Sequence, residues 1–144
     1  MNDHNIFDRN RAILCHFDSY STALVFARYG DCVLAPAPLP EGASAISAPS
    51  EPGEQHTPSA VLDAMVAQYG LDPSQLTLND GFQEWISSDS GPIRIHLVRF
   101  TTIDAPHQAI ESFGVFKPIS GMRGLPMNEL NLMRQVFNLI MSGG

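Results

Sequence analysis

The stretch "EPGEQHTPSAVLDAMVAQYGL", residues 51–71, carries the signals for the start, the apolar face and the end of a helix. Thr57 followed by Pro58 is typical of a helix N-cap and its first turn. Gly70 readily adopts the left-handed backbone that ends many helices. We therefore expect an amphipathic helix between Thr57 and Gly70. Its buried face has helical spacing and comprises Val61, Leu62, Met65, Val66 and Tyr69.

Residues 36–57, on the N-terminal side of this helix, are rich in proline, alanine, serine and glycine. Proline lacks an amide donor and restricts the residue before it, so repeated prolines disfavour regular structure. We expect a long loop here, interrupted at most by a short strand in "ASAIS", residues 43–47. A loop of this length in a small domain is either functional or disordered.

Further upstream, two apolar runs, Ala23–Ala27 and Cys32–Ala35, flank the tripeptide Tyr29-Gly30-Asp31. Glycine permits the backbone of a tight turn, which predicts a β-hairpin formed by the two runs. The segment "RAILCHF", residues 11–17, predicts another strand, with a short helix from Phe7 as the alternative.

Two strands are predicted on either side of "SSDSGP", residues 87–92, which is a typical turn sequence. The candidates are "LTLNDGFQEWI", residues 76–86, and "PIRIHLVRFTTI", residues 92–103. In the second, side chains alternate as in a strand with two different faces, with Ile93, Ile95 and Leu97 against Arg94, His96 and Val98. "FGVFKPI", residues 113–119, predicts a further short strand.

The closing segment "LPMNELNLMRQVFNLIM", residues 125–141, predicts a second helix. Pro126 near its start fits the first turn of a helix. Residues 142–144 are expected to fray. The expected apolar stripe of this helix consists of Leu130, Met133, Phe137 and Ile140.

The order of these elements indicates the fold class. Strands come first, then a loop, a helix, a long hairpin, a strand and a helix, which disfavours a doubly wound parallel sheet. At 144 residues the chain is long enough for one domain and too short for two. We expect a single α+β domain, an α/β/α sandwich with a mixed sheet between helices, after a flexible start at residues 1–11.

The charge balance argues against several classes of function. The chain has 8 Lys and Arg residues against 15 Asp and Glu residues, a net charge of −7, and no basic run. Nucleic-acid binding depends on clustered positive charge, so we expect no nucleic-acid partner. No apolar stretch approaches the roughly 20 residues that span a bilayer, and the N-terminus lacks a signal-peptide pattern. We therefore expect a cytoplasmic protein without a membrane partner.

The two cysteines, Cys15 and Cys32, each lie among apolar residues. Two thiols in a domain of this size suggest a reducing compartment, in which cysteine acts as a small buried hydrophobic residue. We expect two buried free thiols, with a disulfide between them as the alternative.

The order of elements resembles that of the Nudix hydrolase family over roughly residues 22–141. "ALVFARYGDCVLAPA" is similar to the hairpin that opens a Nudix domain, and "GPIRIHLVRFTT" to its central strand. Residues 48–71, "APSEPGEQHTPSAVLDAMVAQYGL", are similar to the family's signature segment, a loop and a helix that end in Gly-Leu. The resemblance implies a Nudix-like sandwich fold.

The chain departs from that family at the residues that carry its chemistry, in the signature G-x₅-E-x₇-R-E-U-x-E-E-x-G-U. Aligned on Gly70-Leu71, the chain has Asp63-Ala64 in place of Arg-Glu and Ala67-Gln68 in place of Glu-Glu. Gln55 takes the earlier glutamate position, or Glu54 if the loop shifts by one residue. In the family these glutamates hold divalent cations against a pyrophosphate, and alanine offers no oxygen ligand. We therefore expect no catalytic residue, no metal site and no cofactor.

The candidates for ligand binding are Glu54, Arg94, His96 and Arg99. Arg94 and His96 alternate onto one face of their strand, where two basic side chains could meet a phosphate or a carboxylate. Arg99 and Arg123 are the other basic candidates. The five histidines show no spacing typical of a zinc site: His4, His16, His56, His96 and His107.

These observations favour a binding module for a nucleotide-like small molecule or for a protein, including a second copy of this chain in a homodimer. The alternative that the resemblance implies is a diverged hydrolase of nucleoside diphosphate derivatives, dependent on Mg²⁺ or Mn²⁺. Its metal ligands would lie outside the usual helix, at Glu51, Glu54, Asp104 and Glu111. A structural domain without a ligand is the third hypothesis.

Overall fold

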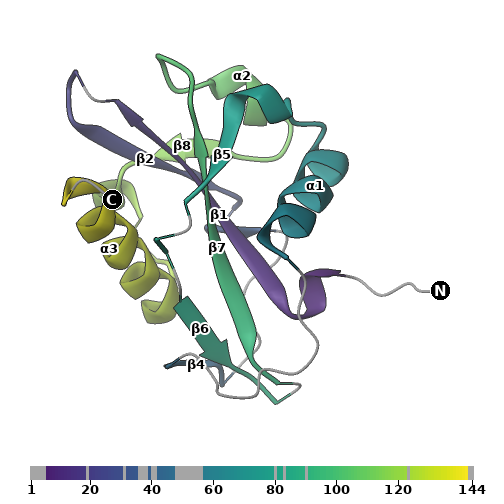
Figure 1. Ribbon diagram of the computed structural model, residues 1–144. Coiled ribbons are helices and arrows are strands. Elements are labelled where there is room, and N and C mark those ends of the chain that lie inside the picture. The colour runs from purple at the N-terminus through teal and green to yellow at the C-terminus, as the bar shows by residue number, and fades with distance from the viewer. Residues whose placement is uncertain are drawn as a thin grey trace.

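A mixed sheet of eight strands forms the centre of the molecule in the computed structural model (Figure 1). The structure describes residues 6–18, 20–30, 32–35, 39, 42–47, 57–79, 81–82, 84–89, 91–122 and 124–142. The strands are β1 (Asn10–Asp18), β2 (Ala23–Arg28), β3 (Leu34–Ala35), β4 (Ser44–Ile46), β5 (Leu76–Leu78), β6 (Glu84–Ser87), β7 (Ile93–Phe100) and β8 (Val115–Lys117). The helices are α1 (Pro58–Tyr69), α2 (His107–Ile110) and α3 (Met127–Met141), with 3-10 turns at Ile6–Asp8, Pro73–Gln75 and Ile119–Gly121.

The two central strands, β1 and β7, run parallel to each other. Their paired residues extend from Asn10 with Arg94 to His16 with Phe100. The other pairings between described strands are antiparallel, in the order β4-β6-β7-β1-β2-β8, with β3 also beside β1 and β5 also beside β7. The expected α+β class with a mixed sheet is confirmed.

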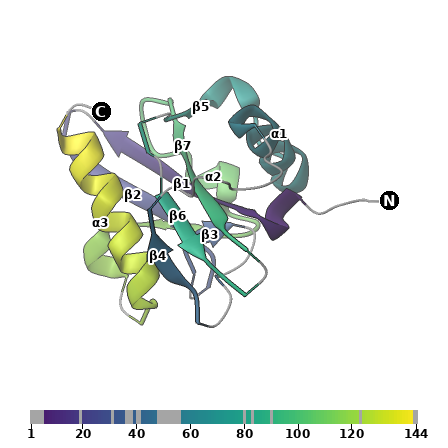
Figure 2. The same ribbon diagram turned by 60° about the horizontal axis from the view of Figure 1, so that its bottom comes forward.

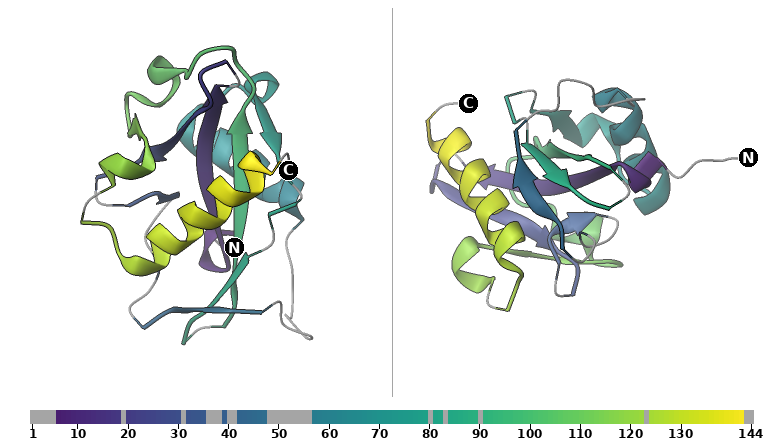
Figure 3. Two further views of the ribbon diagram at one scale, coloured as in Figure 1. Left: turned by 90° about the vertical axis from the view of Figure 1, so that its left-hand side faces the viewer. Right: turned by 90° about the horizontal axis from the view of Figure 1, so that it is seen from below.

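Side chains of the central strands alternate between two hydrophobic cores. Ile13 of β1 and Leu97 of β7 belong to the core beneath α3, whereas Leu14 and Val98 belong to the core beneath α1. Figure 2 shows the sheet between the two helices, and in the left panel of Figure 3 α3 crosses in front of β1 and β7 with α1 behind them. The two helices therefore cover opposite faces of the sheet, as the sequence predicts.

The residues quoted at the start of the sequence analysis set the limits of α1. The side chain of Thr57 accepts a hydrogen bond from the backbone N–H of Ala60 at 3.1 Å, and Pro58 lies in the first turn. Gly70 ends the helix with a left-handed φ of 66°. Val61 and Met65 are fully buried against the sheet. The predicted start, end and buried face of this helix are confirmed.

Two predictions of strand pairing are corrected by the structure. The runs before and after the 29–31 tripeptide do not form a hairpin together, because β2 and β3 each pair with β1. The tight turn itself is present, since Tyr29 and Cys32 exchange backbone hydrogen bonds of 2.6 and 3.1 Å. The segment 76–86 is two strands, β5 and β6, both antiparallel to β7. The long strands β1 and β7 are buried on both faces. Along its outer edge, β1 pairs with both β2 and β3, and β7 pairs with both β5 and β6.

The limits of the chain's irregular segments differ partly from expectation. Residues 6–11, expected within a flexible start, form a 3-10 turn and the beginning of β1. The short strand expected in residues 43–47 is present as β4, and most of the remaining 36–57 loop lies outside the described residues.

The apolar stripe predicted for α3 is wrong at Phe137, which is 42% exposed. Leu132 and Val136 are buried beside the predicted Met133 and Ile140, so the buried face is rotated from the expected stripe. Glu129, in the first turn, lies on this buried face and is only 1% exposed. The sequence prediction counted only apolar residues, so it could not place the Glu129 carboxylate between α3 and the sheet.

The buried Glu129 carboxylate joins α3 to the segment that leads into β3. Its Oε1 accepts a hydrogen bond from the backbone N–H of Val33 at 2.8 Å. Burial raises the pKa of Glu129, and hydrogen bonds from Val33 and the Cys32 thiol oppose that rise. Burial also raises the pKa of Cys32 and of Cys15 to about 12. Both cysteines are free and buried, which confirms the expectation of two unpaired thiols.

We predict that Glu129→Ala lowers the free energy of unfolding by about 1–3 kcal/mol, because the buried N–H of Val33 then lacks an acceptor. Glu129→Gln keeps a carbonyl acceptor and removes the buried charge, so its stability at pH 7 should equal or exceed that of the wild type. Urea denaturation of the three proteins measures both differences. Equal loss in the alanine and glutamine variants would contradict the proposed hydrogen bond.

The buried Glu129 carboxyl group should also make the stability of the protein depend on pH. Because its folded-state pKa lies above the ordinary value of 4.5, the native protein holds the Glu129 proton more tightly than the unfolded chain does. The contribution to stability is therefore complete below pH 4.5 and is lost as the pH rises through the raised pKa. Subtracting the urea-derived stability curve of Glu129→Gln from that of the wild type should show this decline.

Candidate functional site

The three ligand-binding candidates that the structure describes, Arg94, His96 and Arg99, lie on two different faces of the sheet. Glu54 lies outside the described residues, as do Glu51 and Arg123. Arg94 and His96 share the α1 face of β7, as the sequence predicts, but Arg99 is an odd number of residues away and lies on the α3 face. Arg99 therefore lies on the opposite face of the sheet from Arg94 and His96.

His96 is held inside the α1 face by a partner on the neighbouring strand. Its Nε2 lies 2.8 Å from Oδ1 of Asn10, and its side chain is only 4% exposed. Burial, together with the charge of Arg94, lowers the pKa of His96 from 6.5 to about 4. At neutral pH His96 is therefore an uncharged ring in a hydrogen-bonded pair, and it offers no positive charge to an anion.

Arg94 packs on an aromatic ring of the adjacent strand. Its guanidinium carbon lies 5.9 Å from the centroid of Trp85, its cross-strand partner between β6 and β7. This is the geometry of a cation–π contact. Its Nε is buried and has no hydrogen-bond partner among the described residues. The contact with Trp85 explains why the half-buried Arg94 side chain is tolerated here. Its Nε still lacks a hydrogen-bond partner within the described residues.

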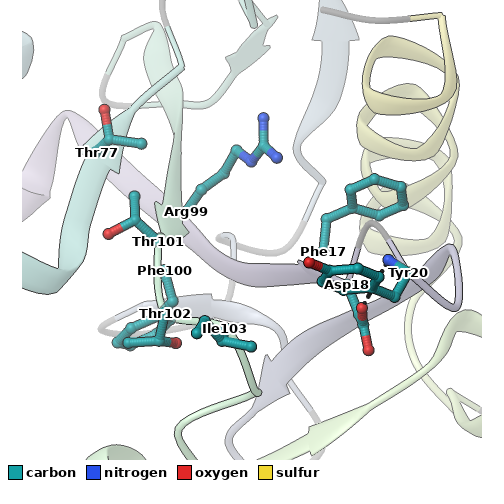
Figure 4. Close-up of a pocket in the computed structure, with 9 residues that line it drawn as sticks. All are labelled: Phe17, Asp18, Tyr20, Thr77, Arg99, Phe100, Thr101, Thr102 and Ile103. Carbon is teal, nitrogen blue, oxygen red and sulfur yellow. Dashed lines mark hydrogen bonds between the residues drawn. The ribbon is translucent and has the colours of Figure 1, made fainter.

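Arg99 lies instead at an open pocket of about 480 Å³, shown in Figure 4. The pocket forms where β1 and β7 end side by side, because parallel strands bring their carboxyl ends to the same edge of the sheet. Its polar side chains are those of Asp18, Thr77, Arg99, Thr101 and Thr102, and its apolar and aromatic ones are those of Phe17, Tyr20, Phe100 and Ile103.

The Arg99 guanidinium is half-buried, and the described residues provide it with no hydrogen bond or ion pair. Arg99 pairs with Cys15 in the β1–β7 ladder, and its charge partly offsets the rise that burial causes in the pKa of the Cys15 thiol. A fixed positive charge beside hydroxyl groups can bind a carboxylate or phosphate through charge-assisted hydrogen bonds. The pocket thus has the composition of an anion-binding site.

Asp18 provides the opposite charge at the edge of the same pocket. Its Oδ1 accepts hydrogen bonds from the backbone N–H groups of Tyr20 at 2.9 Å and Ser21 at 3.4 Å. These hydrogen bonds lower the pKa of Asp18, so the side chain is a carboxylate at neutral pH. Figure 4 shows this carboxylate turned toward the backbone of Tyr20 and away from Arg99.

Comparison with known proteins does not assign a family or a function to this chain. No protein-family model matches the chain, and no curated protein sequence matches it. Among the described residues, no helix is both long and apolar enough to cross a membrane.

Of the carboxylates named for the hydrolase alternative, the structure describes Asp104 and Glu111. Asp104 is exposed on the loop after β7, and Glu111 is exposed directly after α2. Within the described part of the chain, no group of three or more His, Cys, Asp or Glu side chains could hold a metal ion. His107 packs edge-on against the ring of Phe116, with centroids 5.4 Å apart.

Sequence reasoning identified Arg99 but not the residues around it. Thr101 and Thr102 follow the strongest strand pattern, and polar residues at the carboxyl end of a strand are a known signal of a binding site. Asp18 and Thr77 had no such signal, because their proximity depends on the pairing of β1 and β5 with β7. A single sequence does not encode that pairing in any local pattern.

We predict that His96 stays neutral from pH 8 to about pH 5, because its folded pKa is about 4. The unfolded chain takes up this proton near pH 6.5, so His96 makes the native state lose stability as the pH falls from 6.5 to about 4. Histidine ring shifts in an NMR titration measure the protonation directly. A His96 midpoint near 6.5 would contradict the buried Asn10 pair.

Proposed function

We propose that this chain is a Nudix-like domain that binds an anionic, nucleotide-like small molecule and does not hydrolyse it. The observation that carries the proposal is Arg99, a half-buried cation at a pocket of about 480 Å³ that has no hydrogen bond or ion pair with any of the described residues. That volume falls within the range of roughly 300–1,000 Å³ that small-molecule sites occupy. The threonine and aromatic side chains that line the same pocket as Arg99 suit a ligand with a charged end and a flat or apolar body.

The absence of hydrolysis is proposed from the residues of α1. Ala67 and Gln68, aligned with two metal-binding glutamates of the Nudix signature, are exposed on this helix without a carboxylate to offer. Asp63 replaces the arginine and is exposed as well. A phosphoryl-transfer site needs clustered oxygen ligands for its cations, and these three positions supply one carboxylate.

Cellular location and assembly belong to the same proposal. The free, buried thiols of Cys15 and Cys32 support a reducing, cytoplasmic compartment.

The homodimer expected from the sequence stays a prediction, which analytical ultracentrifugation at micromolar concentration can test. The outer side of α3 carries exposed apolar side chains that such contact would cover: Met127, Phe137 and Met141.

Binding of a nucleotide should depend on Arg99. We expect Arg99→Met to weaken binding about ten- to hundredfold, because charge-assisted hydrogen bonds contribute about 1.5–3 kcal/mol. Isothermal titration calorimetry measures the affinity, and a thermal-shift screen over nucleotides selects the ligand, since a ligand that prefers the native state raises its apparent stability. Arg134→Met is the matched control, because Arg134 is exposed on α3 and contacts Asn131 rather than the pocket.

Hydrolysis is tested separately with nucleoside diphosphate derivatives in Mg²⁺ and in Mn²⁺. We expect no turnover above that of buffer. Metal-dependent turnover that Glu54→Gln abolishes would overturn the non-catalytic proposal and establish the hydrolase alternative. No stabilisation by any nucleotide or metal would overturn the ligand-binding proposal.

A further inference from the structure

A second pocket lies between the start of β6 and the C-terminal half of α3. It is open and has a volume of about 290 Å³. Phe82 and Glu84 line one side of it. The other side is formed by side chains of α3 and its C-cap, between Gln135 and Ser142. None of the described residues that line it belongs to the Arg99 pocket, so the two pockets are separate sites.

Glu84 brings a negative charge to this second pocket. It is the cross-strand partner of Ile95, and paired side chains of adjacent strands share one face of the sheet, so Glu84 lies on the α3 face. Its side chain is half-buried and has no hydrogen bond or ion pair with any residue in the described part of the chain. A carboxylate accepts hydrogen bonds through two oxygens and donates none. The pocket therefore contains a strong acceptor for the donors of a ligand.

The carboxyl end of α3 adds to the negative potential at Glu84. Aligned peptide dipoles give this end of the helix a partial negative charge, and its last turn has no basic residue. The Ser142 hydroxyl donates to the carbonyl oxygen of Leu139 at 2.9 Å, so only its lone pairs are left for a ligand. No described lining residue is basic, and the whole chain carries a net charge of −7. The pocket thus favours a cation.

The other lining side chains indicate which kind of cation fits. The lining supplies one carboxylate, and within the described ranges no group of three or more His, Cys, Asp or Glu side chains could hold a metal ion. Quaternary ammonium ions are bound by cages of aromatic rings, whereas Phe82 is the single aromatic residue of the described lining. The exposed amides of Gln135 and Asn138 offer carbonyl oxygens to N–H donors. The lining therefore suits an organic cation that carries N–H groups.

From these charges and acceptors we infer that the second pocket binds a primary alkylammonium ion. An ammonium group combines a compact positive charge with three N–H donors, which match the Glu84 carboxylate and the neutral acceptors of the lining. Its alkyl chain packs on Phe82 and Leu139, in the way that the stems of lysine side chains cover apolar surface. This site goes beyond the proposed nucleotide site and does not depend on it.

Titration with n-butylammonium, followed by ¹H–¹⁵N NMR, tests the inference. We expect saturable shifts of the Gly81, Phe82 and Ser142 amides, with a dissociation constant on the order of 1 mM for so small a ligand. n-Butanol has the same alkyl chain without the charge, and tetramethylammonium has the charge without an N–H donor. At equal ionic strength, neither control compound should produce saturable shifts of these amides.

Glu84→Gln tests the role of the carboxylate with little change in structure. The substitution removes the charge and keeps both the size of the side chain and the backbone pairing of β6 with β7. We expect it to weaken n-butylammonium binding about tenfold, because the ammonium loses a charge-assisted hydrogen bond. Asp63→Asn is the matched control, because it removes an exposed carboxylate of α1 on the other face of the sheet and should keep the wild-type affinity. Thermal melting checks the fold of both variants.

The outcomes separate this inference from the proposed function. The absence of saturable shifts with n-butylammonium would overturn the inference, and so would equal shifts with n-butanol. An affinity that Glu84→Gln leaves unchanged would also overturn it. Arg99→Met should bind n-butylammonium as the wild type does, because Arg99 does not line this pocket. Failure of amine binding therefore leaves the nucleotide proposal standing, and failure of nucleotide binding leaves the amine site standing.

Discussion

The parallel pairing of β1 with β7 is the constraint on which the rest of the structure depends. It joins residues 10–16 to residues 94–100, two segments separated by most of the chain. Both strands are buried on both faces, so their alternating side chains build the two cores that α1 and α3 cover. Because the strands run in the same direction, their carboxyl ends meet at one edge, and the Arg99 pocket forms there.

The same pairing separates charges that look equivalent in the sequence. Arg94, His96 and Arg99 lie within six residues, yet the alternation of β7 places Arg99 on the opposite face from the other two. On the α1 face the polar groups are used internally, since His96 pairs with Asn10 and Arg94 lies over Trp85. On the α3 face Arg99 lines the pocket without a hydrogen bond or ion pair to any residue in the described part of the chain. Position along a strand therefore decides on which face of the sheet each basic residue lies.

Much of the fold could be predicted from local signals, because these signals act over short distances. The limits of α1 follow from Thr57 and Gly70, and the strand character of residues 92–103 follows from its alternation. The strand pairings were partly wrong because a turn at Gly30 indicates a reversal of the chain without indicating which strand the chain then joins. Glu129 was missed as a core residue because its burial depends on the backbone N–H of Val33, 96 residues away. The site was predicted only in part for the same reason. Arg99 belongs to the local pattern of one strand, whereas Asp18 and Thr77 line the pocket because β1 and β5 pair with β7.

The measurement that tests the central claim most directly is chemical-shift mapping by ¹H–¹⁵N NMR while a nucleoside monophosphate is added. If the ligand binds at the carboxyl ends of β1 and β7, the largest shifts should belong to the amides of Thr77, Thr101 and Thr102, with smaller ones at Arg94 and His96. Largest shifts along the α1 face at Arg94 and His96, with none around Arg99, would contradict the account.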